Sequence, residues 1–179
     1  MNAPRIAKIS VPPESRLASS LPSADFADCY ALPDPQPQQE DLLALWLQLT
    51  ARTPRWMDLL MSLRNRAVRL VGLKHLGRLH ADAAKPPEAY RVGERVGIFT
   101  LEGRHPDELL LGDNDRHLHV RLSLRRLPAQ DGLPRLALST VVHEHNRLGR
   151  LYMAVVGPVH SLIVPLMLRQ ISRRSRHRA

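Results

Sequence analysis

The fold is decided by the stretch NRLGRLYMAVVGPVHSLIVPLMLRQISRR, residues 146–174, in which no Asp, Glu, Lys or Arg occurs between positions 151 and 168. Asn146 is a favourable N-cap, and arginines follow the apolar run where a helix dipole favours positive charge. Pro158 and Pro165 each remove a backbone hydrogen bond, so the sequence predicts a long, bent, apolar helix. Such a helix is buried in protein or in lipid. Its uncharged part would span ~27 Å, just under the hydrocarbon core of a bilayer, so membrane crossing is not required.

The composition describes a single domain of 179 residues, long enough for a substantial core. Apolar residues make up 44% of the chain, which argues against wholesale disorder. The 26 basic and 17 acidic residues leave a net charge of +9, which favours anionic partners. A single cysteine, Cys29, excludes an internal disulfide framework. Because the N-terminal residues also lack the apolar core of a signal peptide, we expect a cytoplasmic protein.

The first half of the chain mixes strand and helix patterns. Residues 1–22 are rich in proline and serine and are expected to run extended over the surface, with a short edge strand in IAKISV. DFADCYAL, residues 25–32, alternates like a first strand. Two helices are predicted at residues 40–51 and 54–73, and the second is amphipathic.

The second half switches to strand periodicity. Residues 96–101 and 108–113 flank the loop EGRHPD and predict a hairpin. Residues 116–126 give the clearest strand, with Leu118, Val120, Leu122 and Leu124 on one side and polar residues on the other. The apolar run at 135–145 predicts a central strand, whose register the sequence leaves open.

This order predicts an α+β fold of the helix-grip type, with a curved antiparallel sheet wrapped around the long C-terminal helix and two short helices after the first strand. An antiparallel sheet with one apolar face must cover that face, and the C-terminal helix is the obvious cover. The expected organisation is an extended segment at 1–22, a helix-grip domain at 23–174 and a basic tail at 175–179.

Three segments follow one another in the order WMDLLMSLRNRAVRLVGLK (56–74), DELLLGDNDRHLHVRLSL (107–124) and STVVHEHNRLGRLYMAVVGPVHSLIVPLMLR (139–169). Together they resemble a bacterial domain-of-unknown-function family, numbered twenty-eight sixty-seven, over residues 20–174. That family is similar in predicted fold to the helix-grip superfamily of START lipid-transfer domains, polyketide cyclases and the birch-pollen allergen. It also occurs behind short-chain-dehydrogenase-like modules, but this chain is too short for one and has no GxGxxG after a strand. The resemblance implies a fold and a cavity, and neither a cofactor nor a catalytic residue.

A bent helix under a curved sheet is expected to leave an apolar gap that a ligand can fill. His160 lies within the apolar stretch, and two interpretations stay open for it: a polar contact at the end of the cavity, aided by Tyr152, or a hydrogen-bonded core histidine. Trp56 is expected at the mouth of the cavity. Its walls are predicted to include Phe99, Leu110, Val120, Tyr152, Val156, Val159, His160 and Ile163.

A zinc site is one interpretation of four histidines, because adjacent strands could bring them together as ligands: His117, His119, His143 and His145. His117 and His119 fall on the polar side of their strand, however, and HEH is not HExxH. We therefore predict no metal site and expect solvated or hydrogen-bonded histidines, with His117 and His119 on the outward face. Ser139 and His143 could form a nucleophile–base pair, but no nucleophile elbow accompanies them. Cys29 is interpreted as a small core residue.

Three functions stay open. The first is a small-molecule-binding domain with an apolar cavity for a hydrophobic ligand. The second is a cyclase- or hydratase-like enzyme that uses the same cavity, with His160, His143 and Tyr152 as its acid–base groups. The third is a membrane-peripheral protein, which would touch an anionic membrane surface through the apolar helix at 151–168 and the basic tail. Nucleic-acid binding is not expected, because the few aromatic residues are not interleaved with a basic strand. The basic run at 64–78 is interpreted as a solvated helix face.

Overall fold

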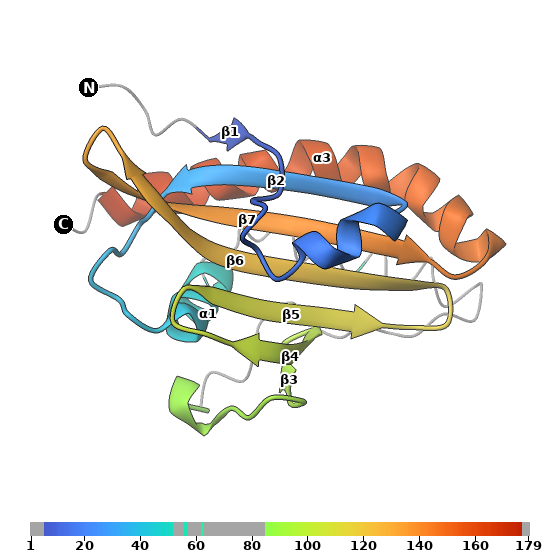
Figure 1. Cartoon of the computed structure of the whole chain (residues 1–179), viewed down its shortest axis with the longest axis horizontal. Coiled ribbons are helices and arrows are strands. Elements are labelled where there is room, and N and C mark those ends of the chain that lie inside the picture. The colour runs from blue at the N-terminus through green and yellow to red at the C-terminus, as the bar shows by residue number, and fades with distance from the viewer. Residues whose placement is uncertain (1–5, 52–55, 57–61, 63–84, 177–179) are drawn as a thin grey trace.

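The computed structural model describes residues 6–51, 56, 62 and 85–176, and for 170–176 the backbone alone. The chain enters through β1 (Ala7–Lys8), η1 (Ala18–Ser23), β2 (Phe26–Pro33) and α1 (Leu42–Ala51). It continues through η2 (Pro87–Ala89), β3 (Arg95–Val96), β4 (Phe99–Arg104) and β5 (Glu108–Asn114). It ends with β6 (Leu118–Gln130), β7 (Leu133–Glu144) and α3 (Arg147–Arg176). The α+β architecture is the predicted one: a seven-stranded antiparallel sheet with a long C-terminal helix along one face (Figure 1).

The strands follow the order β1-β2-β7-β6-β5-β4-β3, so the first long strand, β2, pairs with the last, β7. The apolar run at 135–145 is thus a central strand, between β2 and β6. β6 and β7 form a long hairpin that closes at Asp131 and Gly132, with φ values of 52° and 73°. An Asp-Gly pair is favoured at such a turn, because both positions need the left-handed region.

The register divides the side chains between two faces. Leu118, Val120, Leu122 and Leu124 lie on the face that carries the helices, as predicted. We call it the inner face. Leu122 and Leu124 belong to the main core cluster, and Leu118 packs with Met153 of α3. Val120 is half-buried and packs against both clusters, so it lies where they meet.

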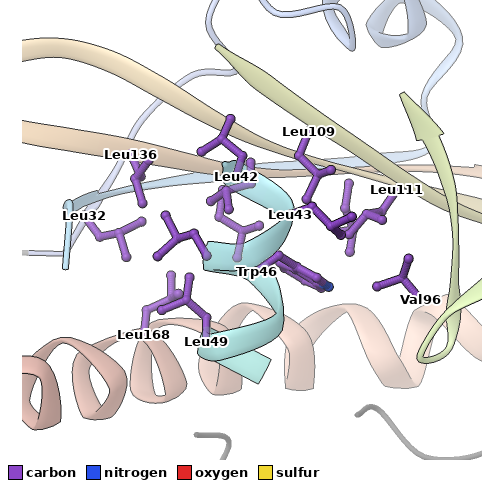
Figure 2. Close-up of a cluster of buried hydrophobic side chains, with 14 of the residues drawn as sticks. Leu32, Leu42, Leu43, Trp46, Leu49, Val96, Leu109, Leu111, Leu136 and Leu168 are labelled. Atoms are coloured by element: carbon purple, nitrogen blue, oxygen red, sulfur yellow. The ribbon is translucent and has the colours of Figure 1, made fainter. Parts of the chain in front are cut away.

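The main core cluster joins three layers, because residues of α1 lie between the sheet and α3 (Figure 2). Leu43 and Leu45 of α1 are fully buried, and Trp46 stacks edge-on against Phe99 with ring centroids 6.1 Å apart. Leu168 of α3 reaches the same cluster. Full burial of a leucine side chain is worth ~1.5–3 kcal/mol, so this cluster is the main source of stability.

α3 begins where predicted. The Asn146 Oδ1 atom accepts hydrogen bonds from the backbone N–H groups of Leu148 and Gly149, at 3.0 and 3.1 Å. The Asn146 side chain also donates to the carbonyl oxygen of Arg116 at 2.8 Å, which ties the start of the helix to the loop before β6. The helix continues through Pro158 and Pro165.

Three parallel rows of residues run along α3 and differ in exposure. The buried row faces the sheet and comprises Met153, Gly157, Val164 and Leu168. The half-buried row comprises Tyr152, Val156, His160, Ile163 and Met167. The exposed row comprises Leu151, Val155, Val159, Leu162 and Leu166. Each row follows the spacing of one helix face.

The opposite, outer face of the sheet is covered by the N-terminal segment (Figure 1). Leu17 packs there against Leu110 and Val141. We expected this segment to be extended with a short edge strand. β1 is that edge strand, but residues 18–23 form the 3-10 helix η1 instead of an extended chain. Burying Leu17 requires that local turn, which proline and serine content alone does not reveal.

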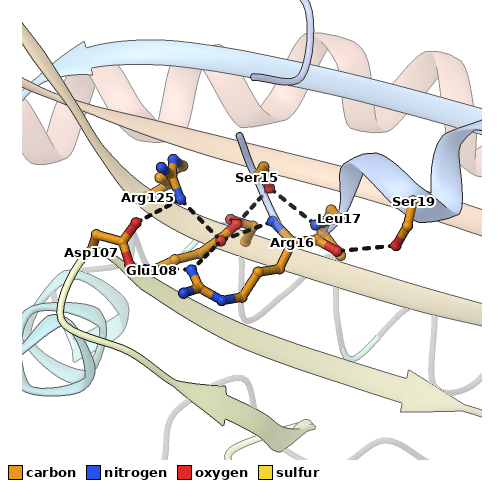
Figure 3. A network of polar contacts seen from close by, with 8 residues as sticks. Ser15, Arg16, Leu17, Ser19, Asp107, Glu108 and Arg125 are labelled. Carbon is orange, nitrogen blue, oxygen red and sulfur yellow. Dashed lines mark hydrogen bonds and ion pairs between the residues drawn. The ribbon is translucent and has the colours of Figure 1, made fainter. Parts of the chain in front are cut away.

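A fully buried carboxylate anchors this segment (Figure 3). The hydroxyls of Ser15 and Ser123 both donate to Glu108 Oε1 at 2.5 Å. Glu108 Oε2 accepts from the backbone N–H of Arg16 at 2.9 Å and from the side chains of Arg16 and Arg125 at 3.1 and 3.2 Å. Burial alone raises the pKa of Glu108, but the hydrogen bonds outweigh it and hold the pKa below the ordinary 4.5.

The second predicted helix, 54–73, and the basic run at 64–78 lie outside the described residues, apart from Trp56 and Ser62. By length and composition alone, residues Arg147–Arg169 of α3 would suffice to cross a membrane; in the described part of the chain no other helix does.

Candidate functional site

The inner face carries one acidic side chain among apolar neighbours on β2. Asp28 alternates with Phe26 and Tyr30 on this face, and its side chain has no exposed surface. Neither carboxylate oxygen has a hydrogen-bond donor in place among the described residues. A buried carboxylate without donors is costly, so its presence calls for a partner.

The partner comes from α3. The Nε2 atom of His160 lies 3.5 Å from Asp28 Oδ2 and 3.4 Å from the hydroxyl oxygen of Thr140. Asp28 and Thr140 are paired residues on adjacent strands, so the imidazole sits above both of them. The ring of Phe26 packs edge-on against it, with centroids 5.7 Å apart.

At 3.5 Å the contact between His160 and Asp28 is a close approach and does not form a hydrogen bond. A proton on Nε2 would face Asp28 Oδ2 and the Thr140 hydroxyl, and Nδ1 would then be the hydrogen-bond acceptor. His160 is half-buried, with 26% of its side chain exposed, whereas Asp28 is covered. Of the two side chains, His160 is therefore the one with exposed surface.

Tyr30 completes the polar group from the neighbouring position of the same strand face. Its hydroxyl donates to the carbonyl oxygen of Ser161 in α3 at 3.3 Å. Burial and the negative charge of Asp28 raise the pKa of Tyr30, so the phenol stays protonated at neutral pH. β2 and α3 are thus joined by Asp28 with His160 and by Tyr30 with Ser161.

Half-buried apolar side chains occur on the same, inner side of the domain as this polar group. Tyr152, Val156 and Ile163 belong to the same row of α3 as His160. From the sheet, Val120 and Phe99 are also half-buried on the inner face. All six of these predicted site residues, His160 included, are therefore on the inner side of the domain and incompletely covered.

Two other predicted wall residues lie elsewhere. Leu110 is on the outer face, because its register partner is Ser123 and its neighbours are Leu17 and Val141. The alternation of β5 puts Leu109 and Leu111 inside instead. Val159 falls in the exposed row of α3, with 46% of its surface exposed.

Trp56, predicted to close the mouth, is 37% exposed. The residues beside it lie outside the described part of the chain, so its role at the mouth stays a prediction.

The histidines of the predicted polar face have separate environments. His119 and His143 lie on the outer face with ring centroids 6.4 Å apart, and His143 Nε2 contacts Ser23 and the carbonyl oxygen of Ser20. His145 Nδ1 lies 2.9 Å from the carbonyl oxygen of Asp115. Within the described ranges, no three His, Cys, Asp or Glu side chains are grouped as metal ligands would be.

The prediction of an outward-facing His117 is wrong. Only 2% of this side chain is exposed, because the first turns of α3 cover it. Its ring packs edge-on against Tyr152 with centroids 5.3 Å apart, and its Nδ1 lies 3.5 Å from Asp115 Oδ2.

The serine–histidine couple does not form either. Ser139 is fully buried and its hydroxyl donates to the sulfur of Cys29 at 3.2 Å. Burial raises the pKa of the Cys29 thiol, which makes it a poor nucleophile at neutral pH. Cys29 is the small core residue that the sequence indicated.

Sequence reasoning missed Asp28 and Tyr30, although a signal was present. Phe26, Asp28, Tyr30 and Leu32 occupy alternate positions in residues 25–32, so an acid falls on the apolar side of the strand. An ionisable residue in that position marks either an ion pair or a binding site.

These features define an α+β domain in which an antiparallel sheet and a long C-terminal helix bring a buried aspartate to within 3.5 Å of a half-buried histidine. Residues 20–167 match the family described as "Protein of unknown function (DUF2867)", and the chain belongs to that family. No curated protein and no solved structure matches the chain.

Proposed function

We propose that this domain binds a small hydrophobic molecule between the inner face of the sheet and the half-buried row of α3. In this proposal His160 accepts a hydrogen bond from a hydroxyl or amine of that molecule. The observation that carries the proposal is the pair of Asp28 and His160, set among incompletely covered apolar residues. Ligand sites combine an apolar lining with a few placed polar groups in this way.

The energetics of Asp28 support a binding role over a purely structural one. A polar pair in a core is often no more stable than apolar residues of the same volume, so stability alone does not explain an acid there. A buried acid that orients a partly exposed histidine does explain the arrangement, because it fixes which nitrogen accepts a hydrogen bond. The proposal also agrees with the helix-grip resemblance, whose members include lipid-transfer domains.

The test is titration with the neutral fluorescent probe N-phenyl-1-naphthylamine. Ile163→Ala removes apolar contact surface from the half-buried row and should weaken probe binding about fivefold or more, at ~0.8 kcal/mol per lost methylene contact. Leu162→Ala is the matched control, because Leu162 is adjacent in the helix and 66% exposed. It should leave the affinity unchanged.

Competition then tests the polar contact. Decanol should displace the probe better than decanoate does, since a hydroxyl donates to His160 and a carboxylate is repelled by Asp28. The preference should disappear in His160→Phe, which keeps a ring and removes the acceptor. Equal effects of the Ile163 and Leu162 substitutions, or no saturable probe binding, would refute the proposal.

The second candidate function is a cyclase- or hydratase-like enzyme that uses the same residues. It is favoured by one observation: an imidazole oriented by a buried carboxylate is also the arrangement of a general base. The two candidates differ in what His160→Gln does in cells. An enzyme would accumulate bound substrate in that variant only, whereas a binding domain would carry its ligand mainly in the wild-type form.

A further inference from the structure

The exposed row of α3 is an apolar surface that the fold leaves uncovered. Leu151 and Leu162 are both 66% exposed, and Val155 is 64% exposed. Of the apolar window within Arg147–Arg169, only 22% is buried, whereas the core helix of a soluble protein is mostly buried. The exposed row therefore differs from the half-buried row beside it and from the buried row on the opposite side of the helix, which the sheet covers in part or fully.

Arginines continue this row at both ends. Arg147 lies four residues before Leu151, and Arg169 lies three residues after Leu166, so helical spacing puts them on the same face. Both are exposed, and they are separated by ~33 Å of helix. α3 contains no Asp or Glu, and positions 173, 174 and 176 add further arginines.

We propose that the exposed row of α3 binds the surface of an anionic lipid bilayer, with the helix lying parallel to the membrane plane. Its leucines and valines would enter the boundary between headgroups and acyl chains, and the arginines at either end would contact lipid phosphates. α3 does not need to leave the sheet, because the buried row faces the opposite way. This binding surface is separate from the site of His160 and does not rest on the function proposed for it.

The charge of α3 favours a membrane over a second copy of the chain as the partner that covers the exposed row. Two copies packed through this row would bring Arg147 near Arg169 in an antiparallel pair, or like arginines together in a parallel one. α3 has no acidic side chain to offset that repulsion. An anionic membrane supplies the missing negative charge, and the cytoplasmic leaflet is such a surface, which fits the cytoplasmic location expected from the sequence.

The test is cosedimentation of the full chain with vesicles of phosphatidylcholine alone, or of phosphatidylcholine with about 30% phosphatidylserine, a fraction typical of PS-rich leaflets. Wild-type protein should sediment with the anionic vesicles and weakly or not at all with neutral ones. Leu151→Gln/Leu162→Gln should weaken binding at least tenfold, because two apolar side chains no longer enter the interface. The matched control is Val92→Gln/Leu133→Gln, whose side chains are 64% and 60% exposed away from α3, and it should bind like wild type.

A second pair of variants tests the charges. Arg147→Gln/Arg169→Gln should lose about 30-fold in affinity, at ~1 kcal/mol per basic residue near the surface. Arg91→Gln/Arg95→Gln changes the net charge equally at exposed positions in and before β3, at the other edge of the sheet from β1 and β2, and should have less than a threefold effect. Absence of cosedimentation, equal effects of target and control pairs, or a wild-type dimer that the leucine substitutions dissociate would overturn the proposal.

Discussion

Replacing Glu108 should reveal how much the N-terminal segment depends on one buried carboxylate. Five donors lie within 3.2 Å of its two oxygens, counting both serine hydroxyls, the backbone N–H of Arg16 and the two arginine side chains. Glu108→Gln keeps the shape of the side chain but removes its negative charge. It also replaces one carboxylate oxygen, an acceptor, by an NH₂ group, a donor, which would face the other hydrogen-bond donors of the site. Breaking a buried charge pair by removing one partner costs ~3–5 kcal/mol, so we expect a loss of about 3 kcal/mol in the free energy of unfolding at pH 7.

Asp107 provides the control for this experiment. It contacts the same two arginines, at 3.2 Å from Arg16 and 2.8 Å from Arg125, but 44% of its side chain is exposed. Asp107→Asn makes the same chemical change in solvent and should cost less than about 1 kcal/mol, as exposed ion pairs do. Urea unfolding followed by the fluorescence of buried Trp46 measures both values.

The pH dependence has a defined sign. Because the folded pKa of Glu108 is held below the ordinary 4.5, its charge stabilises the protein above the unfolded pKa, and this contribution is lost as the pH falls through the folded pKa. The gap between wild type and Glu108→Gln should therefore be largest at neutral pH and narrow in acid. A gap that equals that of Asp107→Asn, or one that does not change with pH, would refute this reasoning.

The remaining predictions concern α3 and the thiol. Asn146→Ala removes the cap of α3 and should lower the free energy of unfolding by ~0.5–2 kcal/mol in urea titrations, and a change near zero would contradict the cap. Gly149→Ala should destabilise the protein by ~1–3 kcal/mol, because its Cβ would lie 2.1 Å from the carbonyl oxygen of His117. Gly157→Ala should be neutral or stabilising, because its nearest neighbours are 3.8 Å away. The reverse order of stabilities would contradict this prediction. Cys29 should react with a thiol reagent only after unfolding, since it is fully buried and its pKa is raised; rapid modification of native protein would disprove this.

The parts of the fold that follow local periodicity could be predicted from the sequence. The alternation from Leu118 to Leu124 identified the inner face correctly, and Asn146 with the uncharged run after it identified α3. These signals are local, because each strand or helix must present one apolar face to the core whatever its partners are.

What could not be predicted depends on contacts between residues far apart in the sequence. Ser15 and Glu108 form a hydrogen bond although they are 93 positions apart in the sequence. The local sequence around either residue does not predict that the other is its partner. His117 was expected on the outer face because it continues the polar alternation, but β6 begins only at Leu118 and the start of α3 covers the residue before it. Leu110 was expected inside because a run of three leucines hides the alternation of β5, which its pairing with Ser123 settles.

Only one of the two residues of the Asp28–His160 pair was predicted from the sequence. His160 was identified because it is an ionisable residue in an apolar helix. Asp28 was overlooked, although it shares one face of its strand with Phe26, Tyr30 and Leu32. Pairing them requires the distance between β2 and α3, which periodicity does not supply.

The proposed ligand site is tested most directly by native mass spectrometry of the purified protein, in the wild-type form and in two matched variants. Ile163→Trp fills the half-buried row of α3, and Leu162→Trp adds the same bulk one residue away on the exposed row. The account predicts a bound small molecule in the wild-type protein and in Leu162→Trp, and its loss from Ile163→Trp. A bound molecule that persists in Ile163→Trp, or none in any of the three proteins, would contradict it.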